Sequence, residues 1–193
     1  PHTRDNKLLE AAYMAHLKVQ GIPVIPSLPG NDGTTICVVG SMMATAQRVA
    51  IGSNPNLTIA TVSQIGKYLA KIHLVPTASL PQRVGWLSPE YVQNNLLRIH
   101  RDFCDNPDAI RILSIYGSCK EFARDVIPKL PMSIIHSDLH SENVLFSNGQ
   151  LTAVVDWEDS MIAPSLMDFV SSAAYWCFDL DRGLIRPKLY RAF

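Results

Sequence analysis

The sequence lacks the features that mark several large classes of protein. It carries 17 lysine and arginine residues against 17 aspartate and glutamate residues, so its formal net charge is zero. No basic stripe stands out, and we therefore expect no nucleic-acid partner and no membrane partner. No run of 18 apolar residues occurs, so no transmembrane helix is expected. The sequence does not begin with a signal peptide, which favours a cytoplasmic location.

Cysteine is also scarce and scattered. The four cysteines, Cys37, Cys104, Cys119 and Cys177, form no C-x-x-C pair, and none has a histidine at the spacing of a metal site. We therefore expect free thiols in place of a disulfide framework or a zinc site. The composition is that of a globular protein, with 47% hydrophobic and 18% charged residues. A chain of 193 residues is long enough for one sizeable core or two small lobes.

Apolar spacing and turn residues outline the secondary structure of the first part of the chain. The spacing over residues 7–20 predicts a helix, which Gly21 and the prolines after it should end. Residues 31–33, Asn-Asp-Gly, are typical of a hairpin turn. The stretches 34–40 and 41–49 that follow this turn favour two antiparallel strands.

Helical spacing dominates after these strands. Thr58 is a suitable N-cap for a helix that runs to about His73, and further helices are expected at 88–101 and 108–128. Pro131 then interrupts the chain. Strands early in the sequence and helices after them indicate an α+β fold with two unequal parts.

The residues that can carry chemistry are concentrated in 133–159, SIIHSDLHSENVLFSNGQLTAVVDWED. A polar loop at 136–143 is followed by two apolar, β-branched stretches that the turn Ser-Asn-Gly-Gln joins. The asparagine–glycine pair in this turn strongly favours a tight hairpin, and a hairpin brings its two ends together. Asn143 at its entry and Asp156 at its exit should therefore be neighbours.

These side chains fit the division of labour that phosphoryl transfer needs. Amide and carboxylate oxygens from Asn143 and Asp156 are ligands that Mg²⁺ accepts together with water and phosphate oxygens. Asp138 lies five residues before Asn143 on the polar loop, where it could orient a substrate hydroxyl and accept its proton. The metal would neutralise charge while the carboxylate positions the attacking oxygen.

Three motifs in this region resemble the kinase-like phosphotransferases. HSDLHSEN matches the loop H-x-D-x-x-x-x-N, and Asp156 follows Asn143 by thirteen residues, as in cores of the protein-kinase type. Asp156-Trp157-Glu158 is similar to the D-W-E of the superfamily of aminoglycoside phosphotransferases, choline kinases and homoserine kinases. APSLMDF resembles that superfamily's G-D-P-x-x-D-L-A segment and places Asp168 in the matching position. The resemblance implies a protein-kinase-like, two-lobed fold with a small β-containing lobe and a larger, mostly helical lobe that carries the hairpin.

The resemblance extends to both sides of this region. Residues 7–28 look like the helix of the small lobe, which would make Glu10 the partner of an ATP-contacting lysine. The segment AAYWCFD resembles the A-W-C-F segment of the homoserine kinase branch. His136 and Asp168 are expected to brace the polar loop structurally. The segments TTICVV and SMMATA resemble the last strands of the small lobe and the hinge, so adenine would meet backbone groups of Met43, Ala44, Thr45 and Ala46.

The sequence also departs from the family. It contains neither a glycine-rich phosphate loop nor a lysine strand of the V-A-I-K type, which the family carries before the helix at 7–20. We interpret the chain as truncated at both ends. Residues 1–50 would then be the remainder of the ATP-binding lobe and the hinge, and residues 51–193 an incomplete helical catalytic lobe.

The function expected from these motifs is that of a small-molecule kinase. The resemblance implies transfer of the γ-phosphoryl group of ATP, with Mg²⁺, to a hydroxyl of a small molecule. Asp138 would position and deprotonate that hydroxyl. The homoserine kinase branch and the acidic pair Glu158 and Asp159, which could meet an ammonium group or simply form a solvated turn, favour an amino acid or amino alcohol such as homoserine.

Three alternatives stay open from the sequence. An aminoglycoside is the nearest alternative acceptor, because it is also a polyol with ammonium groups. A catalytically inactive binding module would keep the kinase fold. A metal-dependent hydrolase could use His136, Asp138, His140 and Asp156 as ligands. The sequence says nothing firm about oligomeric state.

Overall fold

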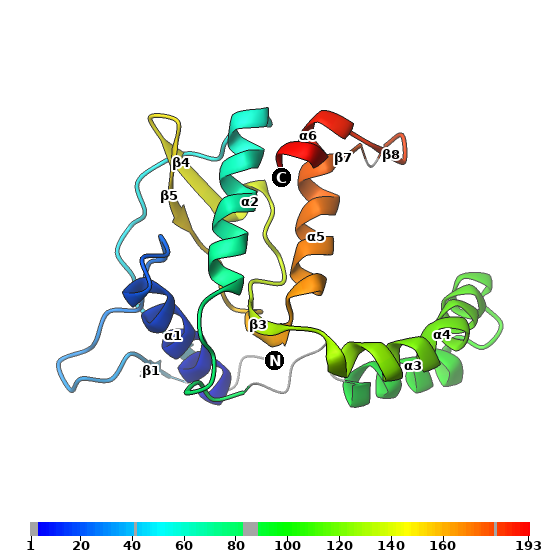
Figure 1. Ribbon diagram of the computed structural model, residues 1–193. Helices are drawn as coiled ribbons and strands as arrows, with labels where there is room; N and C mark the ends of the chain where they lie inside the picture. The colour runs from blue at the N-terminus through cyan, green and yellow to red at the C-terminus, as the bar shows by residue number, and fades with distance from the viewer. Residues whose placement is uncertain (1–3, 41, 83–88, 180) are drawn as a thin grey trace. The chain divides into compact units, whose positions relative to one another are not determined.

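The computed structural model describes residues 4–40, 42–82, 89–179 and 181–193 (Figure 1). These residues form two compact units. The first contains residues 1–83 and 132–193, and the second is the intervening segment 84–131. This division sets an internal segment apart from the rest of the chain, whereas the expected lobe boundary cuts the chain once at residue 50. That lobe boundary stays a prediction.

The first unit begins with α1 (Arg4–Val19), which matches the helix predicted at 7–20. It ends where expected, because Gly21 takes a left-handed φ of 77° and the N–H of Ile22 donates to Leu17 O at 3.0 Å. The two predicted strands are present but short: β1 (Cys37–Val39) pairs antiparallel with β2 (Met42–Ala44).

The turn predicted for this hairpin is wrong in position. The two strands follow one another with only Gly40 and residue 41 between them, and residue 41 lies outside the described residues. Residues 31–33 instead close a separate loop, in which the N–H of Gly33 donates to Gly30 O and the N–H of Gly30 donates to Thr34 O. The Asp32 carboxylate accepts hydrogen bonds from the backbone N–H and the hydroxyl of Thr34. Such local bonds stabilise a turn by themselves, so the turn sequence occurs here without a hairpin.

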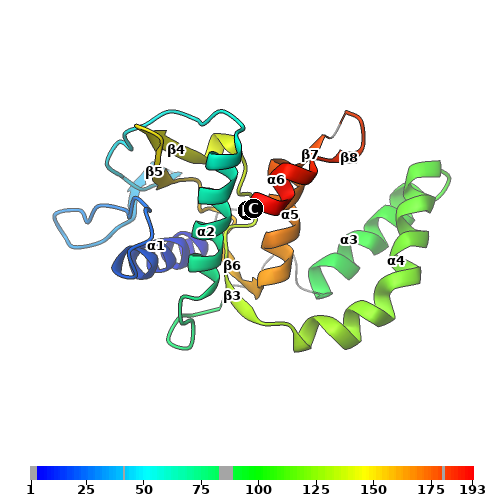
Figure 2. The ribbon, with the colours of Figure 1, turned by 45° about the horizontal axis from the view of Figure 1, so that its top comes forward.

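Two long helices cover the central strands of the first unit. The helix α2 (Ile59–His73) starts at its predicted cap, since Thr58 Oγ1 accepts the N–H of Thr61 at 3.1 Å. The strands β3 (Met132–Ile135) and β6 (Met161–Pro164) form an antiparallel pair. Both α2 and α5 (Ser165–Cys177) contact β3, and α6 (Pro187–Ala192) contacts both helices (Figures 1 and 2). The short strands β7 (Phe178–Asp179) and β8 (Leu184–Ile185) pair between α5 and α6.

The core of this unit joins distant parts of the chain. Its side chains come from α1, α2, the polar loop, the hairpin after it and α5, and removing them from water supplies the main driving force for the fold. Two tryptophans are nearly fully buried, and each donates its ring N–H to a backbone carbonyl: Trp157 to Val154 and Trp176 to Leu139. The other buried members include Tyr13, Leu17, Ile65, Leu69, Ile134, Leu139, Val144 and Val154.

The second unit is a pair of helices, α3 (Pro89–Asp102) and α4 (Pro107–Val126), followed by the short 3₁₀ helix η1 (Ile127–Lys129). These confirm the helices predicted at 88–101 and 108–128, apart from residue 88, which lies outside the described residues. Asn106 starts α4, because its side-chain oxygen accepts the N–H groups of Asp108 and Ala109. Within the described part of the chain, no helix is both long and apolar enough to span a membrane.

Candidate functional site

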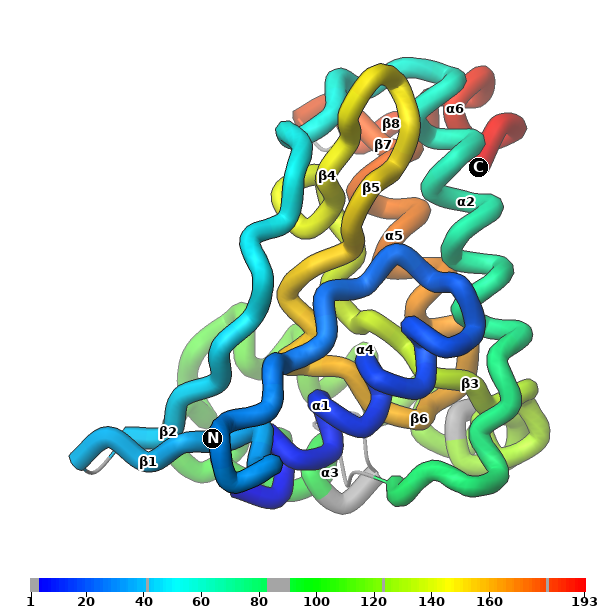
Figure 3. Tube along the Cα trace, turned by 90° about the vertical axis from the view of Figure 1, so that its left-hand side faces the viewer, coloured from blue at the N-terminus to red at the C-terminus, as the bar shows by residue number. Residues whose placement is uncertain are grey.

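The hairpin of β4 (Val144–Ser147) and β5 (Gln150–Val154) forms as predicted (Figure 3). Asn148 and Gly149 both take positive φ, 51° and 74°, which suits a two-residue turn between twisted strands. Gln64 of α2 fixes the turn, since its amide donates to Gly149 O at 2.8 Å and accepts the N–H of Leu151 at 3.2 Å. The turn of the hairpin is therefore hydrogen-bonded to α2.

The two predicted metal ligands lie at the base of this hairpin. Val144 pairs with Val154, and the N–H of Val155 donates to Asn143 O at 2.9 Å, so Asn143 and Asp156 end neighbouring strands. Asp156 is exposed and has a φ of 62°, a conformation that costs energy in a residue other than glycine and is enriched at functional sites. Among the described residues, none donates a hydrogen bond to the Asp156 carboxylate.

The Asn143 side chain is oriented by the polar loop. Its amide nitrogen donates to Asp138 O at 2.8 Å and lies 3.4 Å from Asp138 Oδ2. With the nitrogen turned toward the loop, the amide oxygen is left for another partner. An amide oxygen and a carboxylate at one strand end are the hard donors that suit Mg²⁺, so the residues fit such an ion. The structure thus brings Asn143 to Asp138 directly and brings Asp156 near Asn143 through the backbone.

His136 is fully buried beneath the polar loop, and both of its ring nitrogens are engaged. Nε2 donates to Val155 O at 2.9 Å, and Nδ1 accepts the N–H of Asp138 at 3.3 Å. The ring packs on Trp157 at a centroid distance of 4.7 Å. Burial lowers the pKa of His136, which favours the neutral ring that this bonding pattern needs. These contacts leave no nitrogen for the metal that a hydrolase would bind through His136.

Asp168 supports the same loop from the first turn of α5. Its buried carboxylate accepts the N–H of His136 at 3.0 Å and the N–H of Ser137 at 2.9 Å, and it lies 3.0 Å from His73 Nε2. Ser137 has a φ of 75°, a strained value for serine that these hydrogen bonds hold in place. The backbone just before Asp138 is therefore tied to α5 and, through His73, to α2.

The other predicted site residues lie on α1, on β2 with the residues after it, and on the loop after Asp156. Glu10 is nearly buried on α1 and pairs with Lys7 at 2.8 Å, and the same lysine lies 3.9 Å from Glu158 Oε2. Asp159 is exposed, and its backbone oxygen accepts the Ser137 hydroxyl at 3.2 Å. Met43 and Ala44 belong to β2, and Ala46 O accepts the N–H of Leu28 at 2.7 Å. The roles predicted for Glu10, Glu158, Asp159 and Met43, Ala44, Thr45 and Ala46 stay predictions.

Two contacts of the polar loop were not predicted from the sequence, although His140, which makes one of them, was named there as a possible metal ligand of a hydrolase. Asn54 donates to the carbonyl oxygens of Ser141, Glu142 and Val144, and so holds the end of the loop. His140 Nε2 lies 3.2 Å from Asp138 Oδ2. Neither contact has a local sequence signal, because in each case the side chain's direction depends on the fold.

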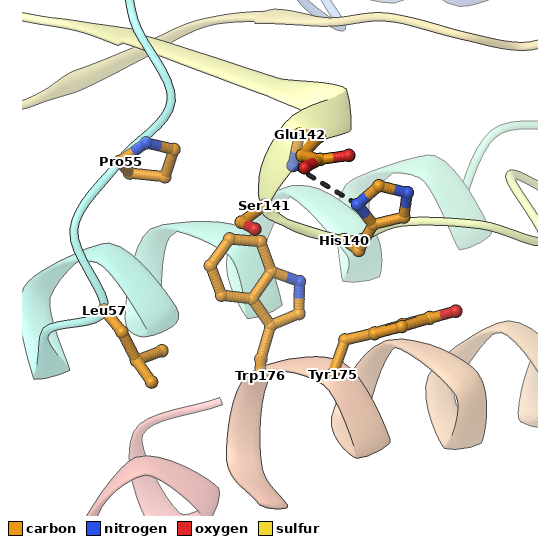
Figure 4. Close-up of a pocket in the computed structure, with 7 residues that line it drawn as sticks. All are labelled: Pro55, Leu57, His140, Ser141, Glu142, Tyr175 and Trp176. Carbon is orange, nitrogen blue, oxygen red and sulfur yellow. Dashed lines mark hydrogen bonds between the residues drawn. The ribbon is translucent and has the colours of Figure 1, made fainter. Parts of the chain in front are cut away.

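A cavity of about 440 Å³ opens beside His140 (Figure 4). The rings of Tyr175 and Trp176, from the end of α5, form one wall, and the segment before α2 forms another. Within the described residues, no group of three or more histidine, cysteine, aspartate or glutamate side chains is placed to hold a metal ion. The residues that line the cavity are Pro55, Leu57, His140, Ser141, Glu142, Tyr175 and Trp176.

Comparisons with known proteins show the family of this chain. A model of the phosphotransferase enzyme family matches residues 1–192. A homoserine kinase of Granulibacter bethesdensis is 28% identical over 174 residues, which cover 87% of this chain and 53% of that protein. A homoserine kinase of a Bradyrhizobium species is 27% identical over 187 residues, covering 93% and 55% respectively. The chain thus spans about half the length of the curated relatives it matches.

Solved structures share the fold. An amicoumacin kinase in complex with AMP-PNP, Ca²⁺ and Ami has a TM-score of 0.71 at 15% identity, over 90% of this chain and 54% of that one. A spectinomycin phosphotransferase in complex with ADP and spectinomycin has a TM-score of 0.60 at 20% identity, over 86% and 57%. The expected protein-kinase-like α+β fold is confirmed by these matches.

Proposed function

We propose that this chain, which belongs to the phosphotransferase enzyme family, carries the catalytic centre of an ATP-dependent small-molecule kinase. The observation that carries the proposal is the joint placement of Asp138, Asn143 and Asp156 at the base of one hairpin. Asn143 bonds Asp138 through its side chain and Val155 through its backbone, so one residue links the loop to the strand end that bears Asp156.

Asp138 is the group that receives the acceptor hydroxyl. Its carboxylate is about half exposed while its backbone is held by His136 and Asn143, so the side chain faces solvent from a fixed position. A carboxylate held in this way can orient the hydroxyl and accept its proton as the phosphoryl group is transferred. Asp156 and the Asn143 amide oxygen would hold Mg²⁺, which supplies charge neutralisation on the phosphates of ATP when it is bound.

Residues 1–50 would belong to the nucleotide-binding lobe and hinge, and residues 51–193 to the catalytic lobe. In this proposal the backbone of Met43, Ala44, Thr45 and Ala46 meets adenine. Glu10 would pair with an ATP-contacting lysine, and in this chain it lies nearly buried on α1, paired with Lys7.

For the acceptor we propose an amino acid or amino alcohol of the homoserine type. The homoserine kinases support this choice, being related along most of the chain. Glu158 and Asp159 would meet the acceptor's ammonium group, since they directly follow Trp157 on the loop that bears Asp156. Structural similarity to the spectinomycin enzyme favours an amino-bearing polyol as the second candidate.

The test is ATP consumption by the full natural protein with a panel of hydroxyl acceptors. Homoserine, choline, spectinomycin and an aminoglycoside cover the two candidates and one further amino alcohol. We expect ADP release that depends on one acceptor and on Mg²⁺, and that is lost in Asp138→Ala. Acceptor-dependent turnover that is unchanged in Asp138→Ala would remove this site from the reaction, and an absence of turnover with any hydroxyl acceptor would favour the inactive binding module.

A further inference from the structure

We propose that His140 is a positioning residue for Asp138, holding one oxygen of that carboxylate so that the other faces the acceptor hydroxyl. This inference rests on the proposed function, because orienting Asp138 matters only if Asp138 receives the acceptor. His140 Nε2 lies 3.2 Å from Asp138 Oδ2, which is within hydrogen-bond reach. The contact joins two residues of the polar loop that directly flank Leu139 in the sequence.

The bonding around the ring decides which nitrogen carries the proton. The backbone N–H of Glu142 points at His140 Nδ1 at 3.3 Å (Figure 4). A neutral imidazole has one donor and one acceptor nitrogen, so a ring that accepts at Nδ1 carries its proton on Nε2. Asp138 Oδ2, 3.2 Å from Nε2, is the carboxylate oxygen to which we infer this proton is donated. Asn143 Nδ2 also lies 3.3 Å from Nε2, but an amide nitrogen cannot accept the Nε2 proton, and its shortest hydrogen bond is the one to Asp138 O at 2.8 Å.

The ring itself is fixed on two further sides. His140 is the N-cap of the 3₁₀ helix η2 (Ser141–Asn143), so its backbone position is set by that helix. Its ring packs on Tyr175 of α5 at a centroid distance of 5.3 Å, and Figure 4 shows the two rings beside one another at the edge of the cavity. Because the cap position and the packing on Tyr175 fix the His140 ring, its N–H can hold the Asp138 carboxylate in one rotamer. Asp138 Oδ2 then meets both His140 and Asn143, which leaves Oδ1 for the acceptor.

The proposal is tested in the full natural protein with two substitutions at His140. His140→Phe keeps a ring against Tyr175 but cannot donate, whereas the amide of His140→Gln can. We expect kcat to fall on the order of 10- to 100-fold in His140→Phe, the range seen when an orienting partner is lost, while KM for ATP changes by less than about twofold. His140→Gln should recover part of the lost kcat. His100→Phe, the same change at an exposed position of α3, is the matched control and should leave kcat unaltered.

A double-mutant cycle shows whether His140 acts through Asp138. The effect of His140→Phe should vanish in an Asp138→Asn background, because the carboxylate that it orients is gone. An equal loss in both backgrounds would overturn the proposal. If Asp138→Asn lowers turnover and His140→Phe does not, only this inference fails. If Asp138→Asn has no effect, the proposed function fails.

Nitrogen NMR gives a readout that does not depend on turnover. The ring of His140, assigned by the signals missing from His140→Phe, should show the Nε2-protonated neutral tautomer at pH 8. Finding the Nδ1-protonated tautomer would overturn the proposal, since Nε2 could then not donate to Asp138.

Discussion

Asp168 Oδ2 lies 3.0 Å from the backbone nitrogen of His136, although the two residues are 32 positions apart in the sequence. The same carboxylate accepts the N–H of Ser137 through Oδ1. One buried side chain on α5 thus satisfies two consecutive backbone donors immediately before Asp138. Losing this side chain leaves donors buried and unpaired, which costs more free energy than the hydrogen bonds themselves contribute.

We therefore expect Asp168→Asn to lower the free energy of unfolding by about 2 kcal/mol or more, because its amide nitrogen would face one of these donors. Urea unfolding followed by circular dichroism measures the change. The exposed Asp159→Asn is the matched control and should stay within about 0.5 kcal/mol of the unaltered chain. Equal unfolding free energies for Asp168→Asn and the unaltered chain would contradict the bracing arrangement.

Asp138→Ala should lower turnover by a factor on the order of 10² or more with ATP affinity little changed. The reason is that the carboxylate acts on the acceptor hydroxyl, whereas the nucleotide is held by other groups. Steady-state kinetics with a titration of ATP separates the two quantities. Asp125→Ala, which removes an exposed aspartate of α4, serves as control. Near-normal turnover in Asp138→Ala would remove Asp138 from the mechanism.

Asp156→Ala should weaken the binding of Mg²⁺ with ATP, because it deletes one of the two oxygen ligands proposed for the ion. A thermal-shift titration with Mg-ATP measures this in the full natural protein. Asp156→Asn is the informative partner, since asparagine tolerates the positive φ at this position and removes only the charge. If both variants gain as much thermal stability from Mg-ATP as the unaltered protein, Asp156 is not a ligand.

Stability should fall as the pH drops below about 6.5, the ordinary pKa of histidine. Burial lowers the pKa of His136 in the folded chain, so the unfolded chain binds the extra proton first. The loss continues until the pH reaches the lowered native pKa, with a slope of at most about 1.4 kcal/mol per pH unit for this one proton. Unfolding free energies between pH 5 and 8 should show a shallower slope for His136→Gln. Parallel curves for the two chains would mean that His136 is not responsible.

Gly66 of α2 tests the packing of α6. A β-carbon at Gly66 would meet the backbone of Phe193, so Gly66→Ala should destabilise the chain by roughly 1–3 kcal/mol through overpacking. Gly117 lies in α4 with open space around it, and Gly117→Ala should stabilise by up to about 1 kcal/mol because alanine favours the helix. Thermal unfolding of both variants gives the comparison. Shifts in the same direction would contradict the contact between α2 and the C-terminal residue.

Much of the local structure was predictable because local chemistry dictates it. Thr58 and Gly21 mark helix ends through hydrogen bonds and φ values that depend on near neighbours alone. The Asn148–Gly149 turn likewise follows from two residues that accept positive φ. The turn at residues 31–33 shows the limit of such signals, since the Asp32 carboxylate bonds Thr34 there and the strands that follow, β1 and β2, are joined to one another by a later turn.

The candidate site also has one part that the sequence predicted and one part that it did not. The Asn148–Gly149 turn between two apolar stretches was enough to predict a hairpin with Asn143 at its entry and Asp156 at its exit, because a tight turn brings the residues at its ends together. The sequence alone could not place His140 against Asp138, Asn54 under Ser141, or His73 against Asp168. The contacts of Asn54 and His73 join segments that only the packing of α2, α5 and the polar loop around one core brings together, and the direction of the His140 ring depends on its packing against Tyr175 of α5.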